Sequence, residues 1–280
     1  MMMTDNIFSN LRITLWGRLM HRMFPLRKNI IINNIDRVFK DKATSFEKTR
    51  LLKAFYSHLV IVLKDILLVG WLSTDSMKRR VEVRGMEHLL DAVNQNKGVL
   101  ILTGHLGSWE FAVPAGILHL DSLIDKIHII RRPIRKKWLE HLIFQRFQRW
   151  NIKLISSINA PKLVSRALKK KELVFYFLDQ HTSIEKNSGL AVDFFNVKAG
   201  TYRSLAVFAS KYDSPVVPLS CYRAEKGNHV FEFFPALEWQ EHPDNAQAIY
   251  NNTVIYNQIL EQMILAHPEQ WWWVHRRWKL

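Results

Sequence analysis

The spacing of hydrophobic positions along this chain changes near residue 75. Before that point apolar residues recur at helical spacing, and they predict an amphipathic segment to about residue 24, a break at Pro25 and a long helix over residues 45–72. Ser45 is the expected N-cap of that helix, and Lys48 leaves its capping box incomplete. Beyond residue 75, uninterrupted apolar runs, typical of strands buried on both faces of a sheet, alternate with helical segments. The runs occupy residues 98–103, 127–130, 152–155, 173–178 and 216–219.

The alternation of strand and helix predicts an α/β fold. It implies a mainly parallel central sheet with helices on both faces, preceded by N-terminal amphipathic helices. Gly227-Asn228 lies between two β-rich runs and predicts one antiparallel hairpin. We expect an N-terminal helical, membrane-associating segment over residues 1–75 and an α/β domain over residues 76–280. The helices expected in that domain lie at residues 86–94, 135–150, 160–171, 202–212 and 245–266.

The apolar stretch at residues 51–72 is the strongest candidate for a membrane span. Lys64 and Asp65 lie inside it, and each charge near the centre of a spanning helix costs about 2.5–3.5 kcal/mol on insertion scales. The first residues form no secretory signal, because Arg12 and Arg18 interrupt their apolar positions. We therefore expect a protein that lies on a membrane without crossing it. The alternative is a basic soluble enzyme whose first helices cover its own core.

The charge balance requires an acidic partner. The chain has 40 Lys and Arg against 25 Asp and Glu, a formal net charge of +15. Nucleic acid, an anionic membrane surface and a small acidic carrier protein each satisfy that charge. The 10 Trp favour the membrane, although Trp beside basic residues also suits base stacking. The single Cys221 excludes an internal disulfide and a zinc-thiolate cluster, and it favours a reducing compartment.

Polar residues follow several predicted strands, at the edge where open α/β sheets bind their ligands. His105 follows the first run, Arg131-Arg132 the second, and Asp179 the run at 173–178. Glu110 comes five residues after His105, and a helix that begins past His105 would present Glu110 to the imidazole, so that the other ring nitrogen takes a proton. The spacing alone fits a buried structural His equally well, because about one such pair is expected by chance.

Other catalytic patterns are absent from the sequence. It contains no G-x-S-x-G, no G-x-x-x-x-G-K-[ST], no G-x-G-x-x-G and no H-E-x-x-H, so hydrolase, nucleotide-binding and zinc-protease functions lose their usual support. No metal site is predicted. Ser108 is expected to cap a helix, and Cys221 to be a buried structural residue.

Three longer segments form a recognisable set: residues 80–89 (RVEVRGMEHL), 98–110 (GVLILTGHLGSWE) and 268–279 (PEQWWWVHRRWK). With Arg132-Pro133, Asp179-Gln180 and the stretches 194–201 and 215–218, they resemble the late acyltransferases of lipid A biosynthesis, the lauroyl/myristoyl acyltransferase family. The resemblance covers roughly residues 10–280. The His-x4-acid signature is shared with glycerolipid acyltransferases, whereas the terminal His-Arg-Arg-Trp-Lys segment is more particular to the lipid A group.

The resemblance implies acyl transfer from an acyl-carrier-protein thioester to a hydroxyl of a lipid A precursor, at the cytoplasmic face of the bacterial inner membrane. It implies no cofactor; an acyl-carrier-protein or CoA thioester is the co-substrate. His105 would be the general base and Glu110 its partner. Amides near Gly104–Gly107 and Arg132 would stabilise the oxyanion. Substrate contacts are expected at Arg132, Asp179, Gly104, Gly107, Arg276 and Arg277.

Two other functions stay open at this point. The first keeps the chemistry and changes the acceptor to another lysolipid, a glycerophospholipid or an ornithine lipid. The second is a basic nucleic-acid-binding protein whose Trp-rich end stacks bases. Members of the family usually begin with a transmembrane anchor, which this sequence does not show as a clear apolar span, and the expected attachment is therefore peripheral or shallow.

Overall fold

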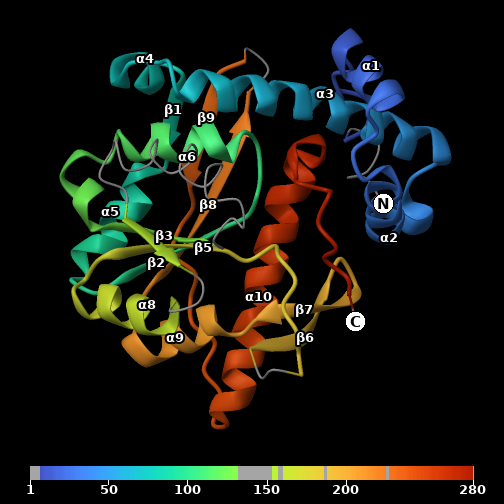
Figure 1. Ribbon diagram of the computed structural model, residues 1–280. Coiled ribbons are helices and arrows are strands. Elements are labelled where there is room, and N and C mark those ends of the chain that lie inside the picture. Colours follow the sequence, from blue (N-terminus) through green and yellow to red (C-terminus); the bar gives the residue numbers. More distant parts are fainter. Residues whose placement is uncertain (1–6, 132–152, 157–159, 186–187, 225–226, 280) are drawn as a thin grey trace.

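A mostly parallel sheet forms the centre of the molecule (Figure 1). The computed structural model describes residues 7–131, 153–156, 160–185, 188–224 and 227–279. The strands of the central sheet are β1 (Val81–Arg84), β2 (Val99–Thr103), β3 (Ile127–Arg131), β4 (Lys153–Ser156), β5 (Leu173–Phe177), β8 (Val216–Arg223) and β9 (His229–Phe233). Their order in the sheet is β1-β9-β8-β2-β5-β3-β4. Adjacent strands pair in parallel, except that β8 and β9 are antiparallel. The predicted α/β fold is confirmed.

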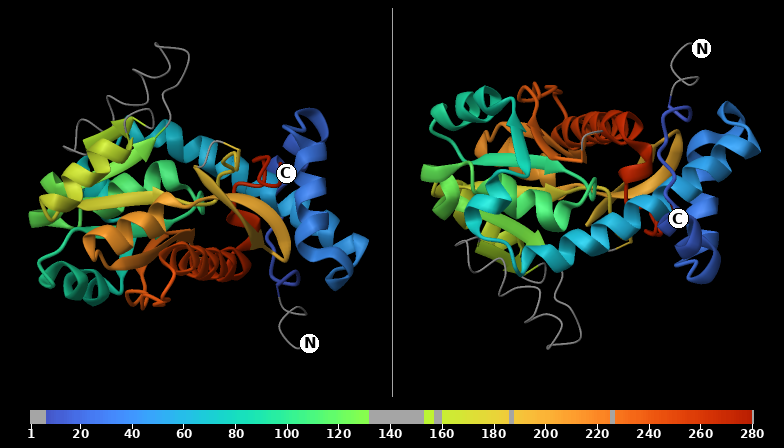
Figure 2. Two further views of the ribbon diagram at one scale, coloured as in Figure 1. Left: turned by 90° about the horizontal axis from the view of Figure 1, so that it is seen from below. Right: turned by 90° about the horizontal axis from the view of Figure 1, so that it is seen from above.

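Helices cover both faces of this sheet, as Figure 2 shows. They are α1 (Leu15–Met23), α2 (Lys28–Phe39), α3 (Ser45–Val69), α4 (Thr74–Lys78), α5 (Met86–Asn94), α6 (Trp109–Ile117), α8 (Ala160–Lys169), α9 (Ser204–Tyr212) and α10 (Asn245–Ala266), with 3-10 turns η1 (Lys40–Lys42), η2 (Asp121–Lys126) and η3 (Pro268–Gln270). All of β2 is buried; Leu100 and Leu102 enter one hydrophobic cluster, and Val99 and Ile101 enter another. The helix expected at 135–150 lies outside the described residues.

A second, two-stranded sheet was not predicted from the sequence. β6 (Gly189–Phe194) and β7 (Val197–Tyr202) pair antiparallel, and β7 delays the start of α9 relative to the predicted helix. Phe195 and Asn196 form the turn with φ of 55° at both positions. Phe is rare in this left-handed region, so the sequence carries no glycine signal for the hairpin.

The long helix α3 begins with a complete capping box. Thr44, not Ser45, is the N-cap: its side chain accepts a hydrogen bond from the amide of Glu47 at 3.3 Å, and the Glu47 carboxylate accepts from the Thr44 amide at 2.7 Å. The prediction of Ser45 with Lys48 placed the same motif one residue too late. Within the described residues, no helix has both the length and the apolar character needed to cross a bilayer.

The N-terminal helices share a hydrophobic cluster with the C-terminal segment. Asn34 of α2 donates hydrogen bonds to the carbonyl oxygens of Trp273 and His275, at 2.8 and 2.7 Å. The rings of Phe39 and Trp273 lie 6.3 Å apart in the same cluster. The helices before residue 75 therefore hold the last residues of the chain in place.

Candidate active site

His105 and Asp179 lie at the carboxyl ends of two adjacent strands. His105 follows β2 after Gly104, and Asp179 follows β5 after Leu178. β2 and β5 pair in parallel, so the carboxyl ends of both strands lie at the same edge of the sheet. A Cβ on Gly104 would lie 2.9 Å from Leu260 Cδ1 and 3.5 Å from Asp179 Cγ. A residue without a side chain is needed here for close packing.

The imidazole of His105 is held by Asp179. His105 Nδ1 donates to Asp179 Oδ1 at 2.8 Å, and the His105 amide donates to Oδ2 at 3.0 Å. The indole N–H of Trp271 donates to the same Oδ2 at 3.0 Å. Burial of Asp179, which is 0% exposed, raises its pKa, but the charge of His105 and these hydrogen bonds outweigh burial and bring the pKa below its ordinary value. The carboxylate therefore fixes the ring with Nε2 as the proton acceptor.

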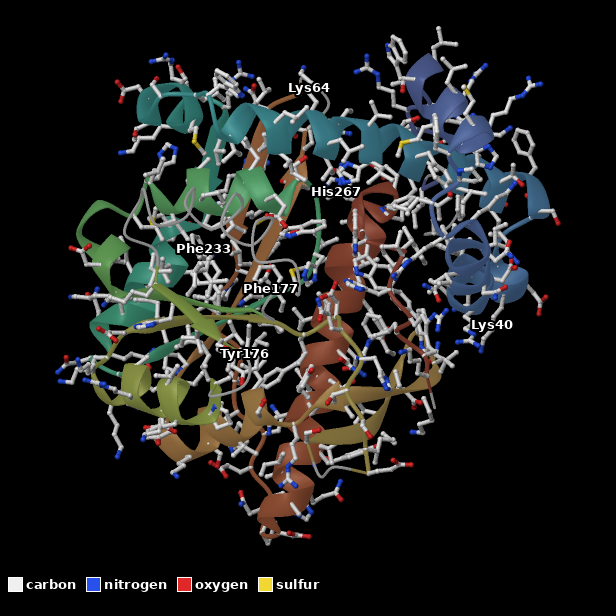
Figure 3. The ribbon with its side chains drawn as sticks, viewed as in Figure 1. Lys40, Lys64, Tyr176, Phe177, Phe233 and His267 are labelled. Atoms are coloured by element: carbon white, nitrogen blue, oxygen red, sulfur yellow. The ribbon has the colours of Figure 1, made fainter. Side chains whose placement is uncertain are left out.

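The Nε2 side of His105 borders a mixed polar and aromatic environment. The side-chain amide of Gln180 donates to Nε2 at 3.3 Å, and the His105 side chain is 15% exposed. The rings of Trp109, Phe177 and His275 lie 5.0, 4.8 and 5.1 Å from the imidazole, measured between centroids. Figure 3 labels Phe177 at the carboxyl end of β5. The imidazole thus has one amide donor at Nε2 and three aromatic rings around it.

The C-terminal segment packs against the loop that carries His105. Trp271 forms an isolated antiparallel bridge with Leu106, and the Trp272 amide donates to the His105 carbonyl at 3.0 Å. The Gly107 amide donates to the Gln270 carbonyl at 2.9 Å. Gly107 has φ of +58°, and a Cβ there would come within 2.7 Å of the Cys221 carbonyl oxygen, so glycine is required at this position.

The amides of this turn already have acceptors inside the chain. The His105 amide donates to Asp179, the Leu106 amide to the Gly104 carbonyl at 2.9 Å, and the Gly107 amide to Gln270. These three amides are thus occupied within the chain, and an oxyanion site near this turn stays a prediction. Gly104 and Gly107 instead allow the close approach of Asp179 and of β8.

Glu110 follows the His105 turn, near the start of α6. It occupies the first turn of α6, where a carboxylate is favourable at the positive end of the helix. The ring nitrogens of His105 have hydrogen bonds to Asp179 and Gln180, and the pairing of His105 with Glu110 stays a prediction. Ser108 stands at the N-cap without a capping hydrogen bond, because its hydroxyl donates to Asp65 Oδ2 at 2.6 Å.

The predicted arginines divide into different roles. Arg277 is 0% exposed, and its guanidinium donates to the Gly200 carbonyl at 2.5 Å and to Thr201 Oγ1 at 2.6 Å. It therefore ties the chain end to β7 and differs from the predicted substrate contact. Arg276 is exposed. Arg131 ends β3, and the predicted site residue Arg132 lies outside the described residues.

Three nearby side chains have atoms that suit a metal ion. The ligand atoms of His105, Asp179 and His275 lie within 4.8 Å of one another. However, both Asp179 oxygens accept hydrogen bonds, and Nδ1 of His105 faces Asp179 directly. These contacts favour a base with its orienting acid over a ligand set.

Sequence reasoning missed several members of the site. Gln180, Phe177 and His275 contact the imidazole, and Trp271 contacts its carboxylate. A signal was available for Gln180 and Phe177, because they flank the end of β5 beside Asp179. The positions of Trp271 and His275 follow from the tertiary path of the chain end.

Buried histidines make the fold less stable in acid. Burial lowers the pKa of His229, His267 and His275 from 6.5 to about 4. Between these values the unfolded chain binds more protons than the folded one, so the free energy of unfolding falls as the pH falls, by up to about 1.4 kcal/mol per pH unit for each His. Urea unfolding across about pH 7 to pH 5 measures this slope.

His267 offers the variant for this prediction. It lies at the end of α10, as Figure 3 shows, and its ring stacks on Tyr222 at 4.0 Å. His267→Gln removes one of these titrating groups and is expected to make the slope shallower. An unchanged slope in the variant would contradict the assignment.

Comparisons with known proteins agree with the sequence resemblance. The family model for bacterial lipid A biosynthesis acyltransferases matches residues 3–280. The lipid A biosynthesis palmitoleoyltransferase of Escherichia coli (strain K12) is 24% identical over 265 residues, which cover 94% of this chain and 82% of that protein. The lauroyltransferase of the same strain is 24% identical over 269 residues with the same coverage. A Haemophilus influenzae lipid A biosynthesis acyltransferase is 23% identical over 233 residues, covering 82% and 69%.

One solved structure resembles the chain more distantly. The crystal structure of the 1-acyl-sn-glycerophosphate (LPA) acyltransferase PlsC from Thermotoga maritima has a TM-score of 0.37 and 10% identity, and the match covers 88% of this chain and 96% of that one. The family model, in contrast, spans nearly the whole sequence, including His105, Asp179 and the C-terminal segment. The chain therefore belongs to the bacterial lipid A biosynthesis acyltransferase family and is an O-acyltransferase.

Proposed function

We propose that this protein transfers a fatty acyl chain from an acyl-carrier-protein thioester to a hydroxyl of a lipid A precursor, with His105 as the general base. The hydrogen bond of 2.8 Å between His105 Nδ1 and Asp179 Oδ1 carries this proposal. It leaves Nε2 as the basic atom of a ring whose side chain is 15% exposed. Family membership supports the lipid A acceptor.

The reaction needs no covalent enzyme intermediate. His105 Nε2 takes the proton of the acceptor hydroxyl, and the oxygen attacks the thioester carbonyl carbon. The new C–O bond forms, the C–S bond breaks, and the imidazolium returns its proton to the leaving thiolate. Asp179 stabilises the imidazolium between these two steps. The Gln180 amide, which donates to Nε2 at 3.3 Å, gives way to the incoming hydroxyl.

Three predicted site residues keep proposed roles. Arg132 would stabilise the oxyanion of the tetrahedral intermediate or bind an acceptor phosphate. Glu110 is the second residue of α6 and follows Trp109, whose ring contacts His105, so a carboxylate there would add to the negative potential around the imidazolium. Arg276 is exposed beside the site and suits contact with an anionic lipid.

The direct test is acyl transfer with purified protein. Acyl-carrier-protein and CoA thioesters are supplied in separate reactions, each with a lipid A precursor, a lysophospholipid or an ornithine lipid. Mass spectrometry of the lipids identifies the product. Transfer to the lipid A precursor from the carrier protein is the expected result, and transfer to the other acceptors alone contradicts the proposal.

A peripheral position on the cytoplasmic face of the inner membrane is part of the proposal. The N-terminal region exposes large apolar side chains next to Arg18 and Arg22. Such a surface inserts apolar groups between lipids while the cations meet anionic headgroups. The exposed side chains are Leu15, Trp16, Leu19, Met23, Phe24 and Leu26.

Removal of Trp16 is expected to weaken membrane binding. Trp16→Ser deletes an exposed side chain whose burial in lipid contributes about 1.5–3 kcal/mol, so the partition constant onto vesicles should fall about tenfold or more. Co-sedimentation with vesicles of anionic lipid measures it. Leu90→Ser, at an exposed apolar residue of α5, is the matched control and should bind like the wild type. Equal binding by all three proteins would contradict the membrane surface at α1.

A further inference from the structure

A cavity of about 200 Å³ lies between the N-terminal helices and the central sheet, apart from the His105 imidazole. α3, the residue before β1, the end of β8 and the start of β9 contribute to its wall. Figure 3 shows Lys64, one of its residues, on α3. The charged and polar residues of its wall are Arg12, Lys64, Asp65, Arg80, Arg223 and His229.

The cavity has an excess of positive charge. Arg12, Lys64 and Arg80 are exposed, and none of them forms an ion pair with a residue that the structure describes. Arg223 donates to His58 Nδ1 at 3.1 Å. The carboxylate of Asp65 already accepts from Ser108 at 2.6 Å and lies 3.4 Å from His229 Nε2. Four cations thus surround one carboxylate that has its own partners, and an anion is the ligand that this wall favours.

A buried ring nitrogen gives a second indication of a ligand. His229 is 5% exposed, and its Nδ1 is buried without a hydrogen-bond partner. An unsatisfied buried polar atom costs free energy unless a bound group satisfies it. A phosphate monoester can serve this atom as donor or acceptor, because its monoanion carries both a hydroxyl and free oxygens. Arg and Lys beside it supply the charge-assisted hydrogen bonds that phosphate prefers.

The surroundings indicate a phosphate carried by a lipid. Leu63 and Leu67 are exposed on α3 on either side of Lys64, and Trp71 just beyond the helix is 88% exposed. Cations next to exposed apolar side chains are typical of a membrane interface. The cavity is smaller than the roughly 300–1,000 Å³ of sites that enclose a whole ligand, so it suits one headgroup substituent.

We propose that this cavity binds a phosphate group of the phosphorylated glycolipid acceptor. The proposal rests on the proposed function for the nature of the acceptor. The cavity connects to the active site through Asp65 and Ser108, because Ser108 follows His105 by three residues in the same turn. A phosphate held there would fix the headgroup at the edge of the sheet where the base lies.

The test measures binding without any acyl transfer, so its result is independent of the proposed reaction. Phosphatidylcholine vesicles carry either a phosphorylated lipid A precursor or the same lipid after phosphatase treatment. The wild type is expected to bind the phosphorylated lipid about tenfold or more tightly than the dephosphorylated one. The triple variant R12Q/K64Q/R80Q, altered at exposed positions, should lose most of that difference.

A matched variant separates this cavity from general electrostatics. K162Q/K169Q/K170Q removes three exposed positive charges from α8 and the residue after it, and should keep the wild-type difference; Figure 1 shows α8 far from α3. Equal losses in both variants, or none in R12Q/K64Q/R80Q, would overturn the proposal. Inorganic phosphate as a competitor distinguishes the source of the group. Little displacement supports the lipid, and full displacement at the concentration of the lipid phosphate overturns the lipid in favour of a free ion.

Discussion

Replacement of His105 by Ala is expected to lower kcat for acyl transfer by about 10²–10⁴-fold, which is the contribution of a positioned general base. Neither hydrogen-bond partner of the ring can take over this role. Asp179 is fully buried behind the ring and accepts hydrogen bonds at both oxygens, and the side-chain amide of Gln180 is not basic. KM for the acceptor should change little, because His105 would contribute a single hydrogen bond to its binding.

The control for this variant is another histidine. His242 is exposed in the loop before α10 and bonds only locally, with Asp244, so His242→Ala should retain the wild-type rate. Circular dichroism and thermal unfolding show whether each variant is folded. A folded His105→Ala protein with the wild-type rate would exclude the base and leave family membership intact.

Much of the fold follows from local patterns in the sequence. The run at residues 98–103 is buried on both faces because α6 covers one side of β2 and the C-terminal elements cover the other. Continuous apolar sequence therefore marks such a strand. The β6–β7 hairpin lacks this kind of signal. Its turn at Phe195 and Asn196 is supported from a distance, since Glu261 of α10 accepts a hydrogen bond from the Phe195 amide at 2.7 Å.

The position of the site could be predicted from the sequence, but the hydrogen-bond partner of His105 could not. The rule that ligands bind at the carboxyl ends of strands selects both His105 and Asp179. Which carboxylate meets the imidazole depends on strand order, however, and the pairing of β2 with β5 brings together residues 74 positions apart. Glu110 is close to His105 in sequence and lies in the first turn of α6. Arg276 and Arg277 are adjacent residues of the same type, but Arg276 is exposed and Arg277 is buried. The sequence cannot distinguish them, because the packing of the C-terminal segment decides which one is buried.

Replacement of Asp179 by Asn is expected to lower kcat by about 10²–10⁴-fold with little change in KM. The amide of Asn can donate to His105 Nδ1, which would move the ring proton to Nε2 and remove the lone pair that accepts the hydroxyl proton. Nitrogen NMR of labelled His reports this change of tautomer directly. Asp179→Glu should recover part of the rate if its longer carboxylate reaches Nδ1.

Two further variants distinguish positioning of the base from support of the fold. Trp271→Phe deletes the indole hydrogen bond to Asp179 Oδ2 and leaves His105 its partner, so it should cost about 1.5–3 kcal/mol of stability and little kcat. Glu110→Gln tests the alternative partner and, by the contacts of His105, should lower kcat far less than Asp179→Asn. If Glu110→Gln is the more damaging change and the tautomer of His105 is the same in Asp179→Asn, then Glu110 orients the base during the reaction and Asp179 serves the fold.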